Sequence, residues 1–188
     1  MKTLAVVCEK GGTGKSTLSG ELYRALDRRG FRASLYSLDG QYNPTRSKKT
    51  EDAEVAVVDT PGVIADNLKD IIEGADLLVV PTRPTPNDIE PFTRTVEIIR
   101  SLTDAPVLIA VNGFNRYKMA ASFKDWLEGK DWADHIVLIP QAEAFPQAEA
   151  MDNSVMDIDS KSKAAQAVER LCNEAINLAG IDIEHIEE

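Results

Sequence analysis

A glycine-rich turn directly after a short apolar segment limits the possible folds of this chain more than any other feature. Residues 3–8 are almost entirely apolar with no polar alternation, a pattern typical of a strand buried on both faces of a parallel sheet. The turn at residues 10–14 contains three glycines, and Lys15 and Ser16 then begin a segment of helical period. This order of strand, glycine turn and helix predicts an anion-binding loop in an α/β fold.

The residues of the turn have the chemistry that a polyphosphate requires. Glycines allow a tight curl in which successive backbone N–H groups point inward, and the following helix contributes its positive N-terminal end. Lys15 supplies a charge for the outer phosphates, and the Ser16 hydroxyl can ligate Mg²⁺. An ordinary glycine turn is the alternative, and Glu9 replaces the first glycine of the general motif. The predicted nucleotide-binding residues are Gly11, Gly12, Thr13, Gly14, Lys15, Ser16 and Thr17.

Short apolar runs alternate with longer segments of helical period along the chain. Strands are predicted at residues 3–8, 32–38, 55–59, 76–81, 106–112 and 135–140. Helices are predicted at residues 15–29, 66–74, 87–102, 120–128 and 161–178. This pattern predicts a three-layer α/β fold of the P-loop NTPase type, with a mostly parallel sheet of about six strands and helices on both faces. We expect one domain at residues 1–180 and an acidic tail at residues 181–188.

The charge balance narrows the classes of partner. The 188-residue chain has a formal net charge of −10, from 21 basic and 31 acidic residues. This favours a cytoplasmic protein and disfavours a globally basic nucleic-acid surface. Cys8 and Cys172 lie in a predicted strand and a predicted helix, so we expect no disulfide framework. We also expect no membrane partner, because no apolar run is long enough to span a bilayer and residues 181–188 carry no basic amphipathic anchor.

Lys10, which precedes the paired glycines, is the most specific feature of the loop. The sequence from Lys10 to Thr17 resembles the deviant phosphate loop of the ParA/MinD family of P-loop ATPases. The resemblance implies that two subunits sandwich two ATP molecules and that Lys10 reaches the phosphates bound to the partner. It therefore implies a nucleotide-dependent homodimer with Lys10 and Lys15 as catalytic residues. The loop begins within ten residues of Met1, as in small plasmid-partition proteins that lack an N-terminal helix-turn-helix.

Two aspartates after predicted strands complete the expected reaction centre. Asp59 would bind Mg²⁺ if its strand neighbours the loop, although Asp-Thr-Pro-Gly is also common turn chemistry. Asp39 lies in residues 37–43, which resemble the first switch of the family. The resemblance implies that Asp39 orients the attacking water, while Ser37 and Gly40 replace an aspartate and a proline of the family. The two aspartates are closer in sequence than is usual in the family, so we expect a sheet shortened by one unit.

Asn112 and Pro140 end two later predicted strands and are the predicted base-binding residues. The amide of Asn112 can donate and accept hydrogen bonds, as the edge of adenine requires, although asparagine here is also typical of a turn. The resemblance places an adenine contact at this strand end, with Pro140 beside the base. Residues 81–88 resemble the proline-containing loop that leads into an interface helix of the family, and we expect Asn87 or Asp88 to cap that helix.

The resemblance covers residues 2–178 and implies a function in positioning cargo. In the family, ATP-bound dimers attach to nonspecific DNA or to a membrane, and a partner stimulates the hydrolysis that resets the dimer. We therefore expect a ParA-like ATPase that uses ATP and Mg²⁺ to partition a plasmid, chromosome or other cargo. Its expected partners are an adaptor or ParB-like stimulating protein and nonspecific DNA, in the cytoplasm or on the nucleoid. Candidate DNA-phosphate contacts are Arg116, Lys118, Lys124, Lys130, Lys161, Lys163 and Arg170.

Two other functions share part of this pattern. A nonhydrolysing regulator would dimerise with ATP without turnover, which the altered switch residues Ser37 and Gly40 suggest. A small-molecule kinase or synthetase would share the phosphate loop, but no insertion rich in arginine and lysine supplies a substrate lid. Lys10 also has no assigned role in such an enzyme. The ParA-like interpretation therefore accounts for more of the chain.

Overall fold

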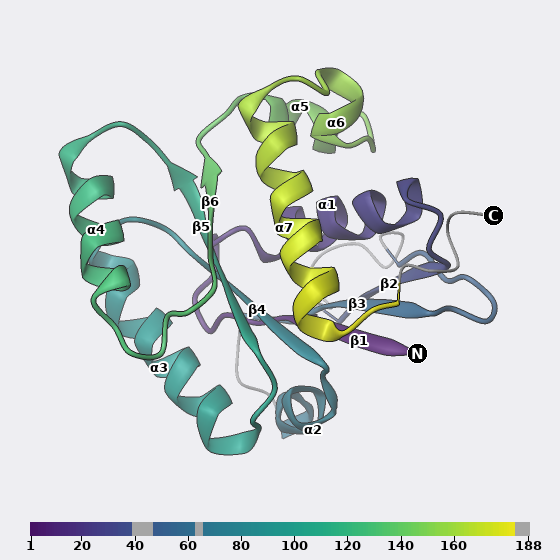
Figure 1. The fold of residues 1–188 in the computed structure, drawn as a ribbon, viewed down its shortest axis with the longest axis horizontal. Coiled ribbons are helices and arrows are strands. Elements are labelled where there is room, and N and C mark those ends of the chain that lie inside the picture. Colours follow the sequence, from purple (N-terminus) through teal and green to yellow (C-terminus); the bar gives the residue numbers. More distant parts are fainter. Residues whose placement is uncertain (39–46, 63–65, 183–188) are drawn as a thin grey trace.

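The computed structural model describes residues 1–38, 47–62 and 66–182, which contain a central six-stranded sheet (Figure 1). The strand order is β2-β3-β1-β4-β5-β6, and every neighbouring pair is parallel. The strands are β1 (Lys2–Val6), β2 (Ala33–Ser37), β3 (Val55–Asp59), β4 (Leu77–Thr82), β5 (Val107–Phe114) and β6 (Ile136–Pro140).

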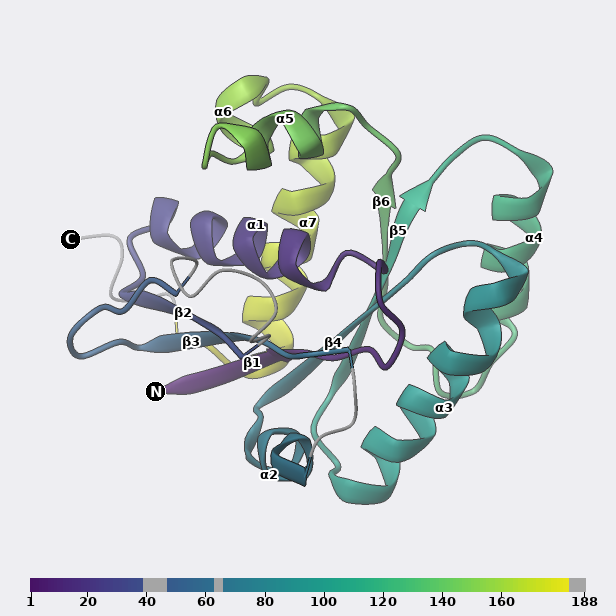
Figure 2. The same ribbon diagram turned by 180° about the vertical axis from the view of Figure 1, so that it is seen from behind.

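Helices cover both faces of the sheet and give the fold three layers (Figure 1 and Figure 2). One face carries α1 (Lys15–Arg28) and α7 (Lys163–Ala179). The other carries α2 (Asp66–Gly74), α3 (Pro86–Leu102) and α4 (Lys118–Glu128). Two short helices, α5 (Ala144–Ala150) and α6 (Val155–Ile158), follow β6 on the side of α1 and α7. Within the described ranges, no helix combines the length and apolar character that a bilayer crossing requires.

Alternate residues of the strands pack into two separate cores. In β5, Leu108 and Ala110 belong to the core beneath α1 and α7, whereas Ile109 and Val111 belong to the core beneath α2, α3 and α4. Successive side chains of a strand point to opposite faces, so a continuous apolar run supplies both cores. This double burial explains why the strand segments show no polar alternation in the sequence.

The strand order places the loop after β1 in the middle of one sheet edge. β1 pairs with β3 on one side, with Val6 opposite Asp59, and with β4 on the other side. The helix that follows β1 covers one face, and the helix that follows β4 covers the other face. The point where the helices after two neighbouring strands cover opposite faces is called the topological switch point. In open α/β sheets, ligands bind there, at the carboxyl ends of the strands. The expectation that Asp59 lies beside the phosphate loop is therefore confirmed.

Residues 47–50 close the outer edge of β2. The N–H of Leu35 donates to the carbonyl of Lys48 at 2.7 Å, and the N–H of Lys48 donates to the carbonyl of Leu35 at 2.9 Å. The Thr50 hydroxyl donates to the carbonyl of Ala33 at 2.7 Å. A short antiparallel segment thus covers this edge in place of a further strand.

The predicted strands and helices are all present, with ends shifted by one or two residues at most. The helices α5 and α6 are additional, because they are too short to show a helical period. One expectation is wrong: α3 begins at Pro86 after the cap position Thr85, so Asn87 and Asp88 lie within its first turn. Proline suits this position because the first N–H groups of a helix have no partner within the helix.

Candidate functional site

Glycines in left-handed backbone conformation shape the loop between β1 and α1. Gly12 has a φ of 74°, and Gly14, which directly precedes α1, has a φ of 97°. A Cβ atom at Gly14 would lie 2.1 Å from Asn112 Nδ2. A larger residue at Gly14 would therefore strain the left-handed backbone and displace the Asn112 amide. The loop leads directly into the first turn of α1, whose N–H groups are suited to an anion.

Lys15 lies inside this loop. The residue is 7% exposed, and its Nζ donates a hydrogen bond to the carbonyl oxygen of Lys10 at 3.1 Å. Gly62, which follows β3, packs against the same ammonium group, since a Cβ atom there would lie 3.4 Å from Lys15 Nζ. The positive charge is thus placed between the loop and the end of β3, where the outer phosphates are expected.

Lys10 points away from Lys15 and toward the start of α3. Its Nζ donates to the carbonyl oxygen of Asn87 at 3.0 Å and lies 2.9 Å from Asp88 Oδ1. Within the described part of the chain, Asp88 Oδ1 has no hydrogen-bond partner, so its contact with Lys10 is an ion pair without hydrogen-bond geometry. The Asp88 side chain is only 4% exposed, and its Oδ2 accepts a hydrogen bond from Thr85 Oγ1. A buried carboxylate therefore sets the direction of Lys10 in the single chain.

Glu9, which replaces the first glycine of the general motif, ties the loop to α3. Its Oε2 accepts a hydrogen bond from Arg94 Nε at 2.7 Å. Its backbone N–H donates to Thr95 Oγ1 at 3.2 Å, and Thr95 is buried. The departure from the general motif thus has a structural reason, because a glycine could not form the ion pair with Arg94.

Ser16 and Asp59 face one cavity of about 400 Å³ between α1, β2 and α5. Asp59 is 3% exposed, and its Oδ1 accepts a hydrogen bond from Ser19 Oγ at 3.4 Å. Ser37 lines the same cavity, and its buried Oγ has no hydrogen-bond partner among the described residues. Mg²⁺ prefers hydroxyl and carboxylate oxygens, and an unpartnered buried oxygen indicates room for a further polar group. The residues present therefore fit Mg²⁺, which Ser16 and Asp59 would hold.

Asn112 supports the phosphate loop directly. Its Nδ2 donates a hydrogen bond to the carbonyl oxygen of Thr13 at 2.9 Å. The amide still has a second hydrogen and its oxygen for a bound base. β5 continues past Asn112 to Phe114, so the expectation that Asn112 ends the strand is wrong. The sequence did not reveal the contact with Thr13, because the two residues are 99 positions apart.

Pro140 ends β6 beside the end of β5. Phe114 lies opposite Pro140 in the strand pairing, and Asn112 lies opposite Ile139. The N–H of Gln141 donates to the carbonyl of Phe114 at 2.8 Å. The two predicted base-binding residues thus lie on neighbouring strands at the same edge of the sheet.

Asp39 lies outside the described residues, together with residues 40–43 of the predicted first switch. Its predicted role in orienting water stays a prediction. Ser37 and Leu38, which precede it, are described, and the N–H of Leu38 donates to the carbonyl oxygen of Asp59 at 2.9 Å. This bond holds Leu38 beside the end of β3.

Glu21 is a buried residue of α1 that the sequence did not indicate as part of the site. Its Oε2 accepts a hydrogen bond from Ser154 Oγ at 2.6 Å, and its Oε1 accepts one from the N–H of Val155 at 3.1 Å. Burial raises the pKa of the Glu21 carboxyl. The contact fastens α6 to α1 beside the cavity, and no local pattern indicates it, because Ser154 is 133 residues away.

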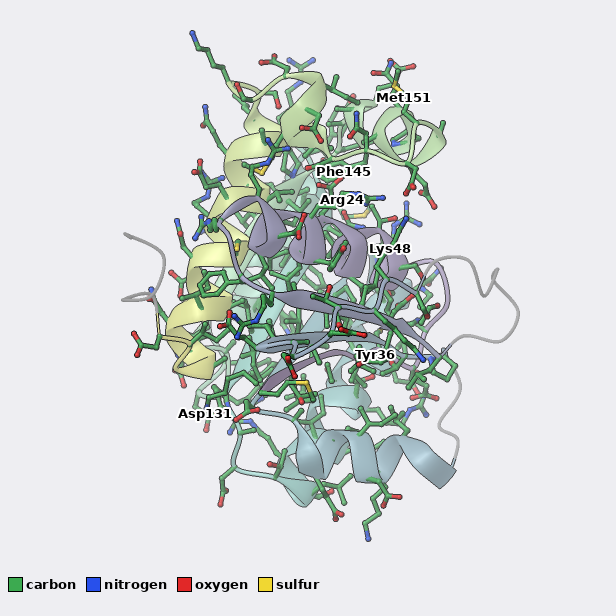
Figure 3. The ribbon with its side chains drawn as sticks, turned by 90° about the vertical axis from the view of Figure 1, so that its right-hand side faces the viewer. Arg24, Tyr36, Lys48, Asp131, Phe145 and Met151 are labelled. Atoms are coloured by element: carbon green, nitrogen blue, oxygen red, sulfur yellow. The ribbon has the colours of Figure 1, made fainter. Side chains whose placement is uncertain are left out.

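A second link joins the same parts of the chain at the surface. Asp152 pairs with Arg24 of α1 at 2.6 Å and with Lys48 at 3.4 Å. Arg24, Lys48 and Phe145 lie along one side of the molecule (Figure 3) and border the cavity that contains Ser16 and Asp59. The links at Glu21 and Asp152 together hold α5 and α6 over α1.

Comparisons with known proteins agree with this geometry. The family model described as the CobQ/CobB/MinD/ParA nucleotide binding domain matches residues 4–181. The chain belongs to this family. The match confirms the resemblance to ParA and MinD that residues 10–17 suggested. A search of curated protein sequences finds no match.

Solved structures of this type have the same fold. Apo McdA from Cyanothece has a TM-score of 0.77 at 15% identity, over 94% of this chain and 99% of that chain. The cell division ATPase MinD from Pyrococcus furiosus has a TM-score of 0.76 at 15% identity, with the same coverage. A putative plasmid partition protein from Borrelia burgdorferi B31, bound to AMPPNP, has a TM-score of 0.76 at 16% identity, over 94% and 98%. The three-layer P-loop NTPase fold is thereby confirmed.

Proposed function

We propose that the chain is a ParA-like ATPase whose ATP-bound sandwich dimer partitions or positions a plasmid, chromosome or other cargo. The observation that supports this best is that two lysines of the same loop point in different directions. Lys15 is buried inside the loop, whereas Lys10 is 33% exposed and points toward α3. A loop that serves one nucleotide in its own subunit needs Lys15 alone. Lys10 is therefore suited to a nucleotide held by a second subunit.

Hydrolysis transfers the γ-phosphoryl group of ATP to water. The bond from the water oxygen to phosphorus forms as the bond to the leaving oxygen of ADP breaks. Lys15 neutralises charge on the outer phosphates of its own nucleotide, and Lys10 of the partner subunit adds a second cation as charge develops. Ser16 and Asp59 would hold Mg²⁺, which when bound would neutralise further phosphate charge. Asp39 orients the water, and Asn112 and Pro140 bind the base.

Removal of the Lys10 charge tests this proposal. We expect Lys10→Ala to bind ATP within a few-fold of the native affinity but to lose ATP-dependent dimers, with hydrolysis reduced by about a hundredfold. Light scattering with ADP, ATP and a nonhydrolysable analogue measures the oligomeric state. Lys69→Ala is the matched control, because Lys69 is an exposed lysine that pairs with Glu73 on the same helix, outside the phosphate loop. Native protein that stays monomeric with every nucleotide would rule out the switch.

Asp39 distinguishes a hydrolysing switch from a nonhydrolysing regulator. If Asp39 orients the water, Asp39→Ala keeps ATP binding and accumulates the dimer, because hydrolysis no longer resets it. Phosphate release and dimer lifetime, measured together, decide the question. If the native chain and Asp39→Ala release phosphate at the same measurable rate, Asp39 has no role in hydrolysis. If neither chain releases phosphate, the nonhydrolysing regulator is favoured.

We further propose that the ATP-bound dimer binds nonspecific DNA and that an adaptor or ParB-like protein stimulates hydrolysis. The net charge of −10 requires a local basic surface for this, and Arg116 and Lys118 are both exposed at the start of α4. Fluorescence anisotropy with duplexes of unrelated sequence should detect binding with ATP but not with ADP. Binding should weaken as salt increases, because phosphate contacts release counterions. Equal binding with both nucleotides would contradict the proposal.

A further inference from the structure

The hydroxyl of Ser37 is a buried polar atom at the end of β2 for which the described part of the chain supplies no hydrogen-bond partner. Nearly all buried polar groups in native proteins are paired, so an orphan of this kind points to a water, an ion or a ligand. The neighbouring backbone N–H groups of Ser37 and Leu38 have hydrogen-bond partners other than this hydroxyl. The N–H of Ser37 already donates to Ser47 Oγ at 3.1 Å, and the N–H of Leu38 donates to the carbonyl of Asp59 at 2.9 Å.

The position of Ser37 identifies what the hydroxyl faces. β2 and β3 are parallel neighbours in which Ser37 lies opposite Asp59, with the two strands about 4.8 Å apart. Ser37, Asp59 and Ser16 all line the cavity of about 400 Å³ between α1, β2 and α5. Residues opposite each other in neighbouring strands present their side chains on the same face of the sheet, so the Ser37 side chain shares a face with Asp59 and lines the cavity that both share with Ser16.

We propose that Ser37 is a positioning residue of the metal site, and that its Oγ accepts a hydrogen bond from a water molecule bound to the Mg²⁺ of the nucleotide. Mg²⁺ usually keeps several of its waters in protein sites, and groups that bond those waters help to orient the metal. A neutral hydroxyl accepts such a bond without adding charge. The inference depends on the proposed function, since the cation enters with the nucleotide.

The affinity for Mg²⁺ at fixed ADP tests this role without dimerisation or hydrolysis. Mg²⁺ is titrated into the chain saturated with a fluorescent ADP analogue. We expect Ser37→Ala to weaken the apparent Mg²⁺ affinity about tenfold, while the affinity for the analogue in EDTA stays unchanged. Ser37→Thr, which keeps the hydroxyl, should stay near the native affinity. Ser37→Asp should bind Mg²⁺ more tightly, because it adds a negative charge beside Asp59.

Thermal unfolding without nucleotide separates this role from a structural one. The Ser37 hydroxyl has no partner among residues 1–38, 47–62 and 66–182, so Ser37→Ala should melt at the native temperature or slightly above it. Ser34→Ala is the matched control on the same strand, because the Ser34 hydroxyl accepts a bond from the N–H of Thr50 at 2.9 Å. Ser34→Ala should melt at a lower temperature and keep the native Mg²⁺ affinity.

The outcomes are distinguishable. A native Mg²⁺ affinity in Ser37→Ala would overturn the inference and leave the proposed function standing. A chain that binds no ADP analogue at all would overturn the proposed function instead. A lower melting temperature for Ser37→Ala without nucleotide would show that the hydroxyl has a structural partner, which also contradicts the inference.

Discussion

Asp88 holds Lys10 in the single chain, and this contact must break before Lys10 can reach a second subunit. We expect Asp88→Asn to favour the dimer, because the ion pair that opposes release is lost while Asn can still accept the bond from Thr85. Lys10 is 33% exposed, so the gain is modest, a few-fold to about tenfold in the dimerisation constant. Sedimentation with a nonhydrolysable ATP analogue measures this constant.

Glu90→Gln is the control for that measurement. Glu90 lies on the same helix, its side chain is 87% exposed, and its Oε1 lies 3.8 Å from Arg94 Nη1. The Glu90→Gln substitution should leave the dimerisation constant unchanged. A weaker dimer in Asp88→Asn would contradict the expectation and indicate that Asp88 contributes to the interface itself.

Glu21 should make stability depend on pH in a particular direction. Burial raises its pKa above the ordinary 4.5, against smaller opposite effects of Ser154 and Arg24, whereas Asp157 raises it further. Above pH 4.5 the unfolded chain loses this proton while the folded chain keeps it. The contribution of Glu21 to stability is therefore complete below pH 4.5 and is lost as pH rises through the raised pKa.

Glu21→Gln removes this proton and keeps an oxygen for Ser154 and Val155. We expect the free energy of unfolding of the variant, relative to the native chain, to increase as pH rises from 4.5 toward the raised pKa. Urea unfolding across this range measures the difference. A difference that is constant with pH would show that the Glu21 pKa is the same in the folded and unfolded chains.

At the residue scale, sequence reasoning singled out groups whose pattern is local. Lys15 and Ser16 were predicted as nucleotide-binding residues because their spacing from the glycines matches that of a phosphate loop. Glu21 was not predicted, and Asp88 was predicted only as a possible helix cap, because their partners Ser154 and Lys10 are distant in sequence. In the sequence, a carboxylate that becomes buried cannot be distinguished from an exposed acidic residue of a helix, because its burial depends on distant elements.

At the element scale, the phosphate loop depends on β5 as well as on its own glycines. The bond from Asn112 to Thr13 supports the loop whatever base is bound. We therefore expect Asn112→Ala to weaken binding of inorganic tripolyphosphate, which has no base, as well as ATP, by roughly five- to tenfold. Competition against a fluorescent nucleotide measures both affinities. A loss confined to ATP would mean that Asn112 acts on the base alone.

The elements themselves were predicted to different degrees. The strands were recognised because burial on both faces demands continuous apolar runs. The start of α3 was placed too late, since Pro86 rather than a polar side chain begins it. α6 has four residues and depends on the Ser154 cap and on Glu21, so a window of local sequence cannot reveal it.

For the whole molecule, the candidate site residues that the structure describes lie at one sheet edge, because all six strands are parallel. If ATP joins two such edges, stability must depend on protein concentration. We expect the melting temperature with a nonhydrolysable ATP analogue to rise with protein concentration, whereas with ADP it should not. Differential scanning calorimetry over a hundredfold concentration range checks this. A concentration-independent melting temperature with both nucleotides would contradict the dimer.

The closed edge of β2 has a consequence for self-association. Each outward N–H of this strand has a partner, at Phe31 for Ala33, at Lys48 for Leu35 and at Ser47 for Ser37. An open edge is a template on which a neighbouring molecule can add a strand irreversibly. Here that template is occupied by the chain itself. Polymerisation through β2 is therefore disfavoured, and the dimer proposed above would use surfaces other than this edge.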